Sequence, residues 1–140
     1  MEIEITVPHA MITSKSVAWG GKAPERFKAS QEAIRYAVQN SPQVTQLKEW
    51  LNSRTKLTLT VEFYSKGRRA HSSDLDSLLS ALLNPIVEGA CGPREAGKPI
   101  PQTKDALFWR AEIAKIKDND EKVIIRINRL DSEQLAPYNF

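Results

Sequence analysis

The sequence predicts an α/β (α+β) fold in which helices pack on one small mixed β-sheet, in the order β-α-β-α-β-β. Apolar residues alternate with polar ones in two separate stretches, near residue 5 and near residue 60, which is typical of half-buried strands. Between and after these stretches, apolar residues recur at the spacing of amphipathic helices. Two further strand-like runs close the chain, and elements in this order favour helices packed against a sheet.

The amino-terminal half is predicted to contain a strand, a long loop and two helices. The strand ends at Pro8, the loop covers residues 9 to 24, and Pro24 opens the first helix because proline suits a first helical turn. Pro42 interrupts that helix, and a short second helix follows. The apolar positions are Ile3, Ile5 and Val7 in the strand, Phe27, Ile34, Ala37 and Val38 in the first helix, and Val44, Leu47 and Leu51 in the second.

The carboxyl-terminal half is predicted to contain three strands and one strongly amphipathic helix. It begins with the clearest strand of the chain, which a basic loop over 66–73 connects to the helix. A glycine- and proline-rich loop over 89–103 follows the helix. The last two strands, over roughly 106–116 and 122–130, are joined by a turn-rich run over 117–120. Pro85 is expected to kink or end the regular part of the helix. The apolar positions are Leu57, Leu59, Val61 and Phe63 in the strand, and Leu75, Leu78, Leu79, Leu82, Leu83 and Ile86 in the helix.

Composition indicates one ordinary globular domain, which we expect over residues 1–130, followed by a tail over 131–140. The 140 residues are 41% hydrophobic and 26% charged, so a core can form without disulfides. Cys91 is the single cysteine, which excludes an intrachain disulfide and favours a reducing, cytoplasmic setting. We expect no signal peptide, since no basic region with an apolar run follows Met1. We expect no membrane span, since no apolar run approaches about 18 residues. The net charge of +3 permits nucleic-acid binding without requiring it.

Two aspartates one residue apart, Asp74 and Asp76, stand at the entry to the amphipathic helix, directly after Arg68, Arg69 and His71. Carboxylates bind a hard divalent cation, and the basic side chains would bind and position a phosphodiester. Residues at i and i+2 diverge on a regular helix, but they can converge where a loop enters one. This arrangement therefore favours a metal-dependent nuclease.

A third aspartate, Asp105, lies at a second junction, between the long loop and a strand. Three carboxylates from two junctions would form an open oxygen site, which suits Mg²⁺ because that ion retains waters and substrate oxygens. Zinc is a poor alternative because Cys91 and the two histidines have no zinc-like spacing.

Ordinary structural roles remain open for the same residues. Ser73 followed by Asp76 resembles a capping box, and acids in a first turn favour the helix dipole. An aspartate at a strand start, such as Asp105, is commonly a solvated turn residue. Arg68, Arg69 and His71 would be solvated surface residues under the same interpretation.

The segment from Arg68 to Lys115 resembles the RusA-type Holliday-junction endonucleases. Asp74-Leu75-Asp76 matches the first acidic pair of that family, Asp105 the second residue of its later Asp-Asp pair, and Lys115 its strand lysine. The resemblance implies a single RusA-like domain over 1–130, often of phage origin, that works as a homodimer on branched, four-way DNA.

This resemblance also implies paired nicks that depend on Mg²⁺, for which Mn²⁺ can substitute. Asp74, Asp76 and Asp105 would be the catalytic, metal-binding acids. The residues expected to contact DNA are Arg68, Arg69, His71, Lys104 and Lys115.

The chain departs from the family pattern at three positions. Ser77 occupies the position of an asparagine, Ser80 that of a lysine that supports catalysis, and Lys104 that of the first aspartate of the later pair. Ser80 removes a cation that could stabilise phosphate charge. A catalytically weak or inactive DNA-binding protein of the same fold is therefore the alternative function. A partner-binding domain in which the aspartates only cap the helix is a third hypothesis.

Overall fold

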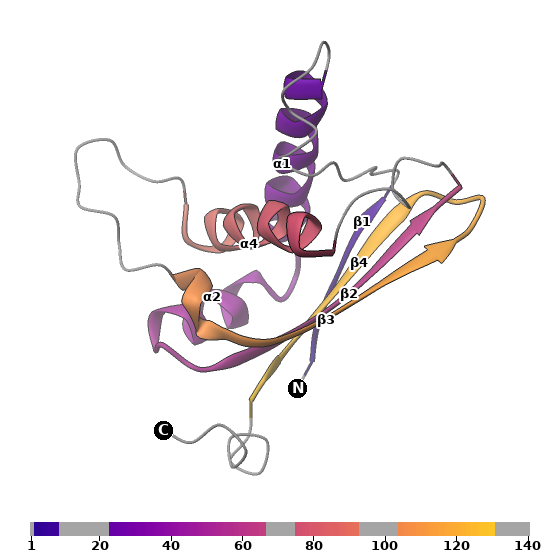
Figure 1. Ribbon diagram of the computed structural model, residues 1–140. Coiled ribbons are helices and arrows are strands. Elements are labelled where there is room, and N and C mark those ends of the chain that lie inside the picture. Colours follow the sequence, from indigo (N-terminus) through magenta and orange to yellow (C-terminus); the bar gives the residue numbers. More distant parts are fainter. Residues whose placement is uncertain (1, 9–22, 67–74, 93–103, 131–140) are drawn as a thin grey trace.

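The computed structural model describes residues 2–8, 23–66, 75–92 and 104–130. Its elements are β1 (Ile3–Pro8), α1 (Ala23–Gln39), α2 (Val44–Asn52), β2 (Leu57–Ser65), α4 (Leu75–Cys91), the 3-10 helix η2 (Lys104–Leu107), β3 (Phe108–Lys117) and β4 (Lys122–Arg129). The predicted fold class is confirmed, since the helices lie against a four-stranded mixed sheet (Figure 1). Within these ranges, no helix has the length and apolar character that crossing a lipid bilayer requires.

The strands are ordered β1-β4-β2-β3 in the sheet. β4 pairs antiparallel with both β1 and β2, whereas β3 pairs parallel with β2, so α4 lies in the crossover that parallel strands need. β3 and β4 follow each other in the chain, yet β2 lies between them. Their connection must cross two strand spacings, roughly 10 Å, which a few extended residues can span. The Asp118 N–H donates to the Ser65 carbonyl at 3.2 Å, which holds the crossing chain at the end of β2.

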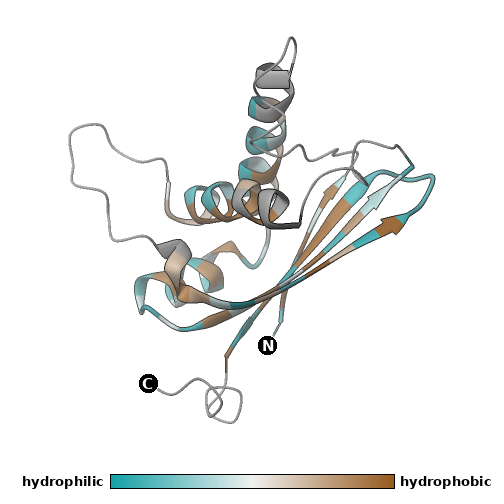
Figure 2. Cartoon of the chain, viewed as in Figure 1, coloured by the Kyte–Doolittle hydropathy of each residue, from teal (hydrophilic) through white to brown (hydrophobic). Residues whose placement is uncertain are grey.

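Alternation along the strands gives the sheet two different faces. Every second residue of β1, β2 and β4 is buried, as the predicted period of two requires. Figure 2 shows the same alternation of apolar and polar residues along the strands. The helices pack on the face that carries the buried residues, and we call the opposite side the open face (Figure 1).

The predicted strand over 106–116 begins later than expected. Its first residues belong to η2, where Leu107 is buried beside the core, and the strand itself covers Phe108–Lys117. The register also shifts at the start of β3, because Leu57 pairs with Phe108 and Thr58 with Arg110. Trp109 is therefore the extra residue of a β-bulge, which bends an edge strand and increases its twist.

The predicted loop over 89–103 also begins later, because α4 continues to Cys91. Gly89 lies where α4 crosses α1: a Cβ there would lie 2.7 Å from the Val38 Cβ and 2.9 Å from the Arg35 carbonyl oxygen. Glycine at this position therefore permits close helix packing and does not end the helix. Arg35 and Glu88 form a salt bridge of 2.8 Å beside the crossing.

Pro85 was expected to kink or end the regular part of the helix, and it does not end it. Pro85 lies inside α4 and has no N–H, so the Ala81 carbonyl one turn earlier loses its usual helical donor. The Gln31 side chain of α1 supplies a replacement, because its Nε2 donates to the Ala81 oxygen at 2.6 Å. A hydrogen bond between two helices thus replaces one within a helix, and α4 continues past the proline.

We expect Gln31→Met to lower the free energy of unfolding by about 1–2 kcal/mol, because the Ala81 carbonyl would lose its donor. With Pro85→Ala present, the restored N–H at position 85 can donate to the same carbonyl. In that background Gln31→Met should therefore lower the free energy of unfolding clearly less. Denaturant unfolding of the four proteins of this double-mutant cycle measures the coupling. Strictly additive effects would contradict this explanation.

Candidate functional site

Two of the three predicted metal-binding aspartates, Asp76 and Asp105, belong to elements that contact each other. Asp76 lies in the first turn of α4, Asp105 lies in η2, and α4 contacts η2. Both side chains, and Asp74 entirely, lie outside the part of the chain that the structure describes. In Figure 1, η2 lies beside the carboxyl-terminal part of α4, whereas Asp76 is in the first turn. The convergence of the three carboxylates therefore stays a prediction.

Two of the predicted DNA-binding residues, Lys104 and Lys115, belong to opposite ends of the η2–β3 segment. Arg68, Arg69 and His71 lie outside the described residues, a few positions after Ser65 ends β2. Ser65 pairs with Lys117, and Lys115 pairs with Phe63, so Lys115 belongs to the same end of the sheet as Ser65.

Lys104, by contrast, begins η2 at the start of β3, and its side chain is not described. The strand from Phe108 to Lys115 spans about 23 Å at the usual rise per residue. Lys115 is thus close in the sheet to where the Arg68 segment begins, and distant from Lys104.

Helix α4, which carries Asp76, is anchored firmly in the core. Leu82 and Ile86 are completely buried, and Leu79 and Leu83 pack against the same cluster. The first turn of this helix therefore extends from a rigid base, as a binding site requires.

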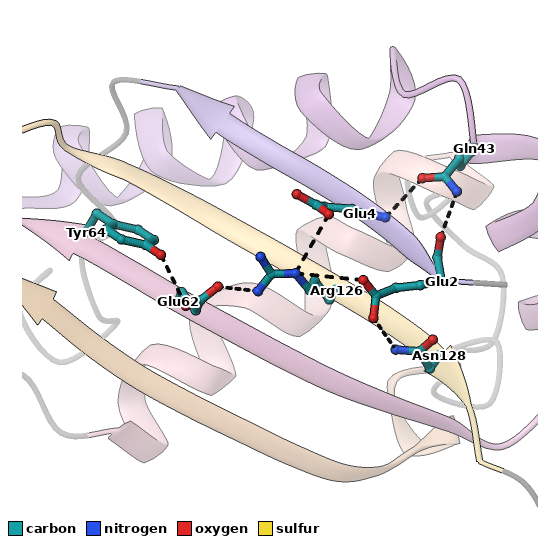
Figure 3. A network of polar contacts seen from close by, with 7 residues as sticks. All are labelled: Glu2, Glu4, Gln43, Glu62, Tyr64, Arg126 and Asn128. Carbon is teal, nitrogen blue, oxygen red and sulfur yellow. Dashed lines mark hydrogen bonds and ion pairs between the residues drawn. The ribbon is translucent and has the colours of Figure 1, made fainter.

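Polar side chains of three strands form a network on the open face that sequence reasoning missed (Figure 3). Arg126 of β4 lies in the centre and donates from its Nη1 to Glu62 of β2. Its Nε lies 3.8 Å from carboxylate oxygens of both Glu2 and Glu4. The Tyr64 hydroxyl donates to Glu62 at 3.1 Å, which extends the network along β2.

These contacts shift three pKa values. The hydrogen bond from Arg126 lowers the pKa of Glu62, and the bond from Tyr64 acts in the same direction. Desolvation, followed by the hydrogen bond to Glu62, raises the pKa of Tyr64. The bond to Glu62 raises the pKa of Arg126 above its already high ordinary value. Glu62 and Arg126 are therefore held as a charged pair and Tyr64 as a neutral donor.

The same region closes part of the free edge of β1. Gln43, between α1 and α2, accepts from the Glu4 N–H at 3.0 Å and donates to the Glu2 carbonyl at 2.8 Å. One side-chain amide thus makes the pair of bonds that a neighbouring strand would make. Such coverage protects an edge strand against pairing with other chains.

The sequence contained a signal for this network, although an incomplete one. Glu2, Glu4, Glu62 and Arg126 all occupy polar positions of the alternating strand patterns. Their meeting depends on β4 lying between β1 and β2, which alternation does not specify.

Two concave regions lie within the described residues. A hollow of about 380 Å³ on the open face is lined mainly by polar groups of β2, β3 and β4, namely Thr58, Thr60, Arg110, Glu112, Asn128 and Arg129. A groove of about 950 Å³ lies between α1, α2 and the end of α4. Its charged lining is balanced, with Glu32 and Glu88 opposed by Arg35 and Lys48.

The described residues contain no group of three His, Cys, Asp or Glu side chains that is placed to hold a metal ion. Glu2, Glu4 and Glu62 gather around Arg126, whose guanidinium already supplies the positive charge. The predicted metal ligands Asp74, Asp76 and Asp105 are not among the side chains that this statement covers.

We expect stability to fall at acid pH partly through Glu62. Because folding lowers its pKa, the carboxylate stabilises the folded state above its unfolded pKa, and this contribution is lost as pH falls through the folded pKa. Thermal unfolding between about pH 5 and pH 3 should therefore depend less on pH in Glu62→Gln than in the wild type. The difference in the free energy of unfolding should be below about 1 kcal/mol, because the pair is partly exposed. Glu49→Gln, an exposed change on α2, is the control. Equal pH dependence in all three proteins would contradict the assignment.

Comparison with known proteins leaves the family assignment open. No protein-family model matches the chain, and no curated protein is significantly similar to it. The resemblance to RusA-type endonucleases therefore rests on Asp74, Asp76, Asp105 and Lys115 in their sequence context, and the function it implies is a proposal.

Proposed function

We propose that this protein is a metal-dependent endonuclease of the cytoplasm that cuts branched DNA, such as a four-way junction, as a homodimer. The observation that carries the proposal is the Asp74-Leu75-Asp76 motif, which enters a core-anchored helix directly after a basic segment. A two-fold dimer would present two such motifs to a DNA junction of similar symmetry.

The donor set suits a hard cation. Asp74, Asp76 and Asp105 would supply carboxylate oxygens only, which are the ligands that Mg²⁺ and Mn²⁺ prefer. Mg²⁺ bound there would lower the pKa of a coordinated water and neutralise charge at the scissile phosphate.

The remaining site residues would bind and orient the DNA backbone. Arg68, Arg69 and His71 precede the acids, and Lys115 lies at the end of the sheet from which that segment departs. Lys104, next to Asp105, would contact the backbone from the other side. Contacts of this kind fix the register of the substrate without reading its sequence.

A DNA-binding protein without cleavage activity is the second candidate, and two observations favour it. Ser80, one helical turn after Asp76, replaces the lysine that the family resemblance would place there. The position of η2 beside the carboxyl-terminal part of α4 would also keep Asp105 away from Asp76 (Figure 1). Under this alternative the basic residues bind DNA, and Asp74 and Asp76 cap the helix.

Asp76→Asn separates these possibilities. We expect it to reduce Mg²⁺-dependent cleavage of a mobile four-way junction by at least about 100-fold, since loss of residues that only orient metal ligands already costs about 10–100-fold. Junction binding in EDTA should remain. Asp118→Asn, an exposed change in the β3–β4 connection, is the matched control and should cut normally.

Cleavage by Asp76→Asn at the wild-type rate would exclude the metal-binding role. Binding with a steep salt dependence but no cleavage by the wild type, in Mg²⁺ or Mn²⁺, would establish the second candidate. A wild type that binds no DNA would leave helix capping as the role of the aspartates.

A further inference from the structure

We propose that Gln31 of α1 is a positioning residue of the candidate cleavage site, because it fixes the direction in which α4 carries Asp76. The inference rests on the proposed function, and it adds a residue that is not among the predicted site residues. The bond from Gln31 to the Ala81 carbonyl joins two helices whose residues are 50 positions apart in the sequence. No local sequence pattern connects them.

The hydrogen-bond ladder of α4 is interrupted between Asp76 and the end of the helix. Pro85 has no N–H for the Ala81 carbonyl, and its ring crowds the same carbonyl. Proline inside a helix is a common cause of bends of more than about 20°. Residues 75–84, which we call the arm, are therefore less constrained in direction by the helix itself than an uninterrupted helix would be.

Helix α1 contacts α4 on both sides of this interruption (Figure 1). After the proline, Gly89 permits close packing, since a Cβ there would lie 2.9 Å from the Arg35 carbonyl oxygen. Arg35 also pairs with Glu88 at 2.8 Å. Before the proline, the Gln31 Nε2 donates to the Ala81 oxygen at 2.6 Å. Helix α1 thus bridges the interruption, and Gln31 is a polar contact between α1 and the arm.

Apolar packing also holds the arm, but it constrains the direction of the arm less. Leu82 is completely buried, and Leu79 and Leu83 pack against the core. The burial of apolar surface is not directional, whereas a hydrogen bond weakens steeply as it departs from linear geometry. The arm can therefore tilt by several degrees while its apolar residues stay buried, and the bond from Gln31 opposes that tilt.

The distance from Pro85 to Asp76 amplifies small tilts of the arm. The helical positions between them span about 13 Å, so a tilt of about 5° at the proline moves the backbone of Asp76 by about 1 Å. A displacement of about 1 Å at a reacting centre can lower a rate on the order of 100-fold. Loss of the bond from Gln31 should therefore reduce cleavage strongly, although Gln31 is neither a metal ligand nor a DNA contact.

The direction of the arm can be measured without a cleavage assay. Two spin labels, at Ser77→Cys in the arm and at Glu49→Cys on α2, report their separation by double electron–electron resonance, and Cys91→Ser removes the natural cysteine. Helix α2 is a suitable reference because its buried residues hold it in the core. We expect Gln31→Met, which keeps the side-chain size but removes the donor, to broaden or shift the distance distribution by about 1–4 Å.

Pro85→Ala separates a lost hydrogen bond from a general loss of packing. Alanine restores the N–H that the Ala81 carbonyl lacks, so the helix itself then fixes the arm. In that background Gln31→Met should leave the width of the distance distribution unchanged, whatever direction the uninterrupted helix takes. Gln39→Met, the same substitution at an exposed position of α1, is the matched control and should leave the distribution unchanged in both backgrounds.

Cleavage by the unlabelled proteins tests the consequence for the site. We expect Gln31→Met to lower the rate constant of Mg²⁺-dependent junction cleavage by about 10–100-fold. Junction binding in EDTA should stay as in the wild type, because Mg²⁺ demands nearly ideal ligand geometry, whereas long basic side chains reach a phosphate from a wider range of positions. Gln39→Met should cleave at the wild-type rate.

Several results would overturn the proposal. They are an unchanged distance distribution in Gln31→Met, equal broadening by Gln39→Met, or equal broadening by Gln31→Met when Pro85→Ala is present. Normal cleavage by Gln31→Met despite a broadened distribution would also overturn the positioning role. A wild type that does not cleave DNA would instead refute the nuclease function, and broadening by Gln31→Met would then still establish that Gln31 fixes the direction of the arm.

Discussion

Strand β2 is hydrogen-bonded to β4 on one side and to β3 on the other, and the rest of the molecule depends on this double pairing. Its odd-numbered residues, from Leu57 to Ser65, are buried against the helices, and its even-numbered ones form the centre of the open face. The segment that leads to Asp74 starts where β2 ends, and the hollow lies over its beginning. The segment before Asp74 and the hollow are thus both positioned by one strand that is buried on one face only.

The open face divides charge between its two halves. Around Arg126, carboxylates of β1 and β2 exceed the basic groups, and the lowered pKa of Glu62 keeps that group ionised. The hollow over β2, β3 and β4 has a more even charge balance, since Arg110 lies 2.9 Å from Glu112.

Helix α4 connects the core to the proposed cleavage site. It crosses α1 closely at Gly89, and Gln31 replaces the hydrogen bond that Pro85 cannot make, so the helix continues to Cys91. Its first and last turns are therefore fixed relative to each other, about 25 Å apart for a helix of 17 residues. This rigidity favours an ordered position for Asp76. It also limits how close η2 can bring Asp105 to Asp76, because η2 lies beside the carboxyl-terminal part of α4.

The sequence by itself determined the class of the fold, most element positions and the acidic motif at the start of α4. These features are local: alternation in β2, helical spacing in α4 and the Asp74–Asp76 pair can each be read within a few neighbouring residues. Only the tertiary structure decided that β2 separates β3 from β4. This order places Arg110, Thr58 and Arg129 around one hollow. It also brings Arg126 to the carboxylates Glu2, Glu4 and Glu62. Strand order results from long-range pairing and the burial of a common apolar face. Any arrangement of the four strands would satisfy the same local alternation, so the open-face sites could not be predicted from it.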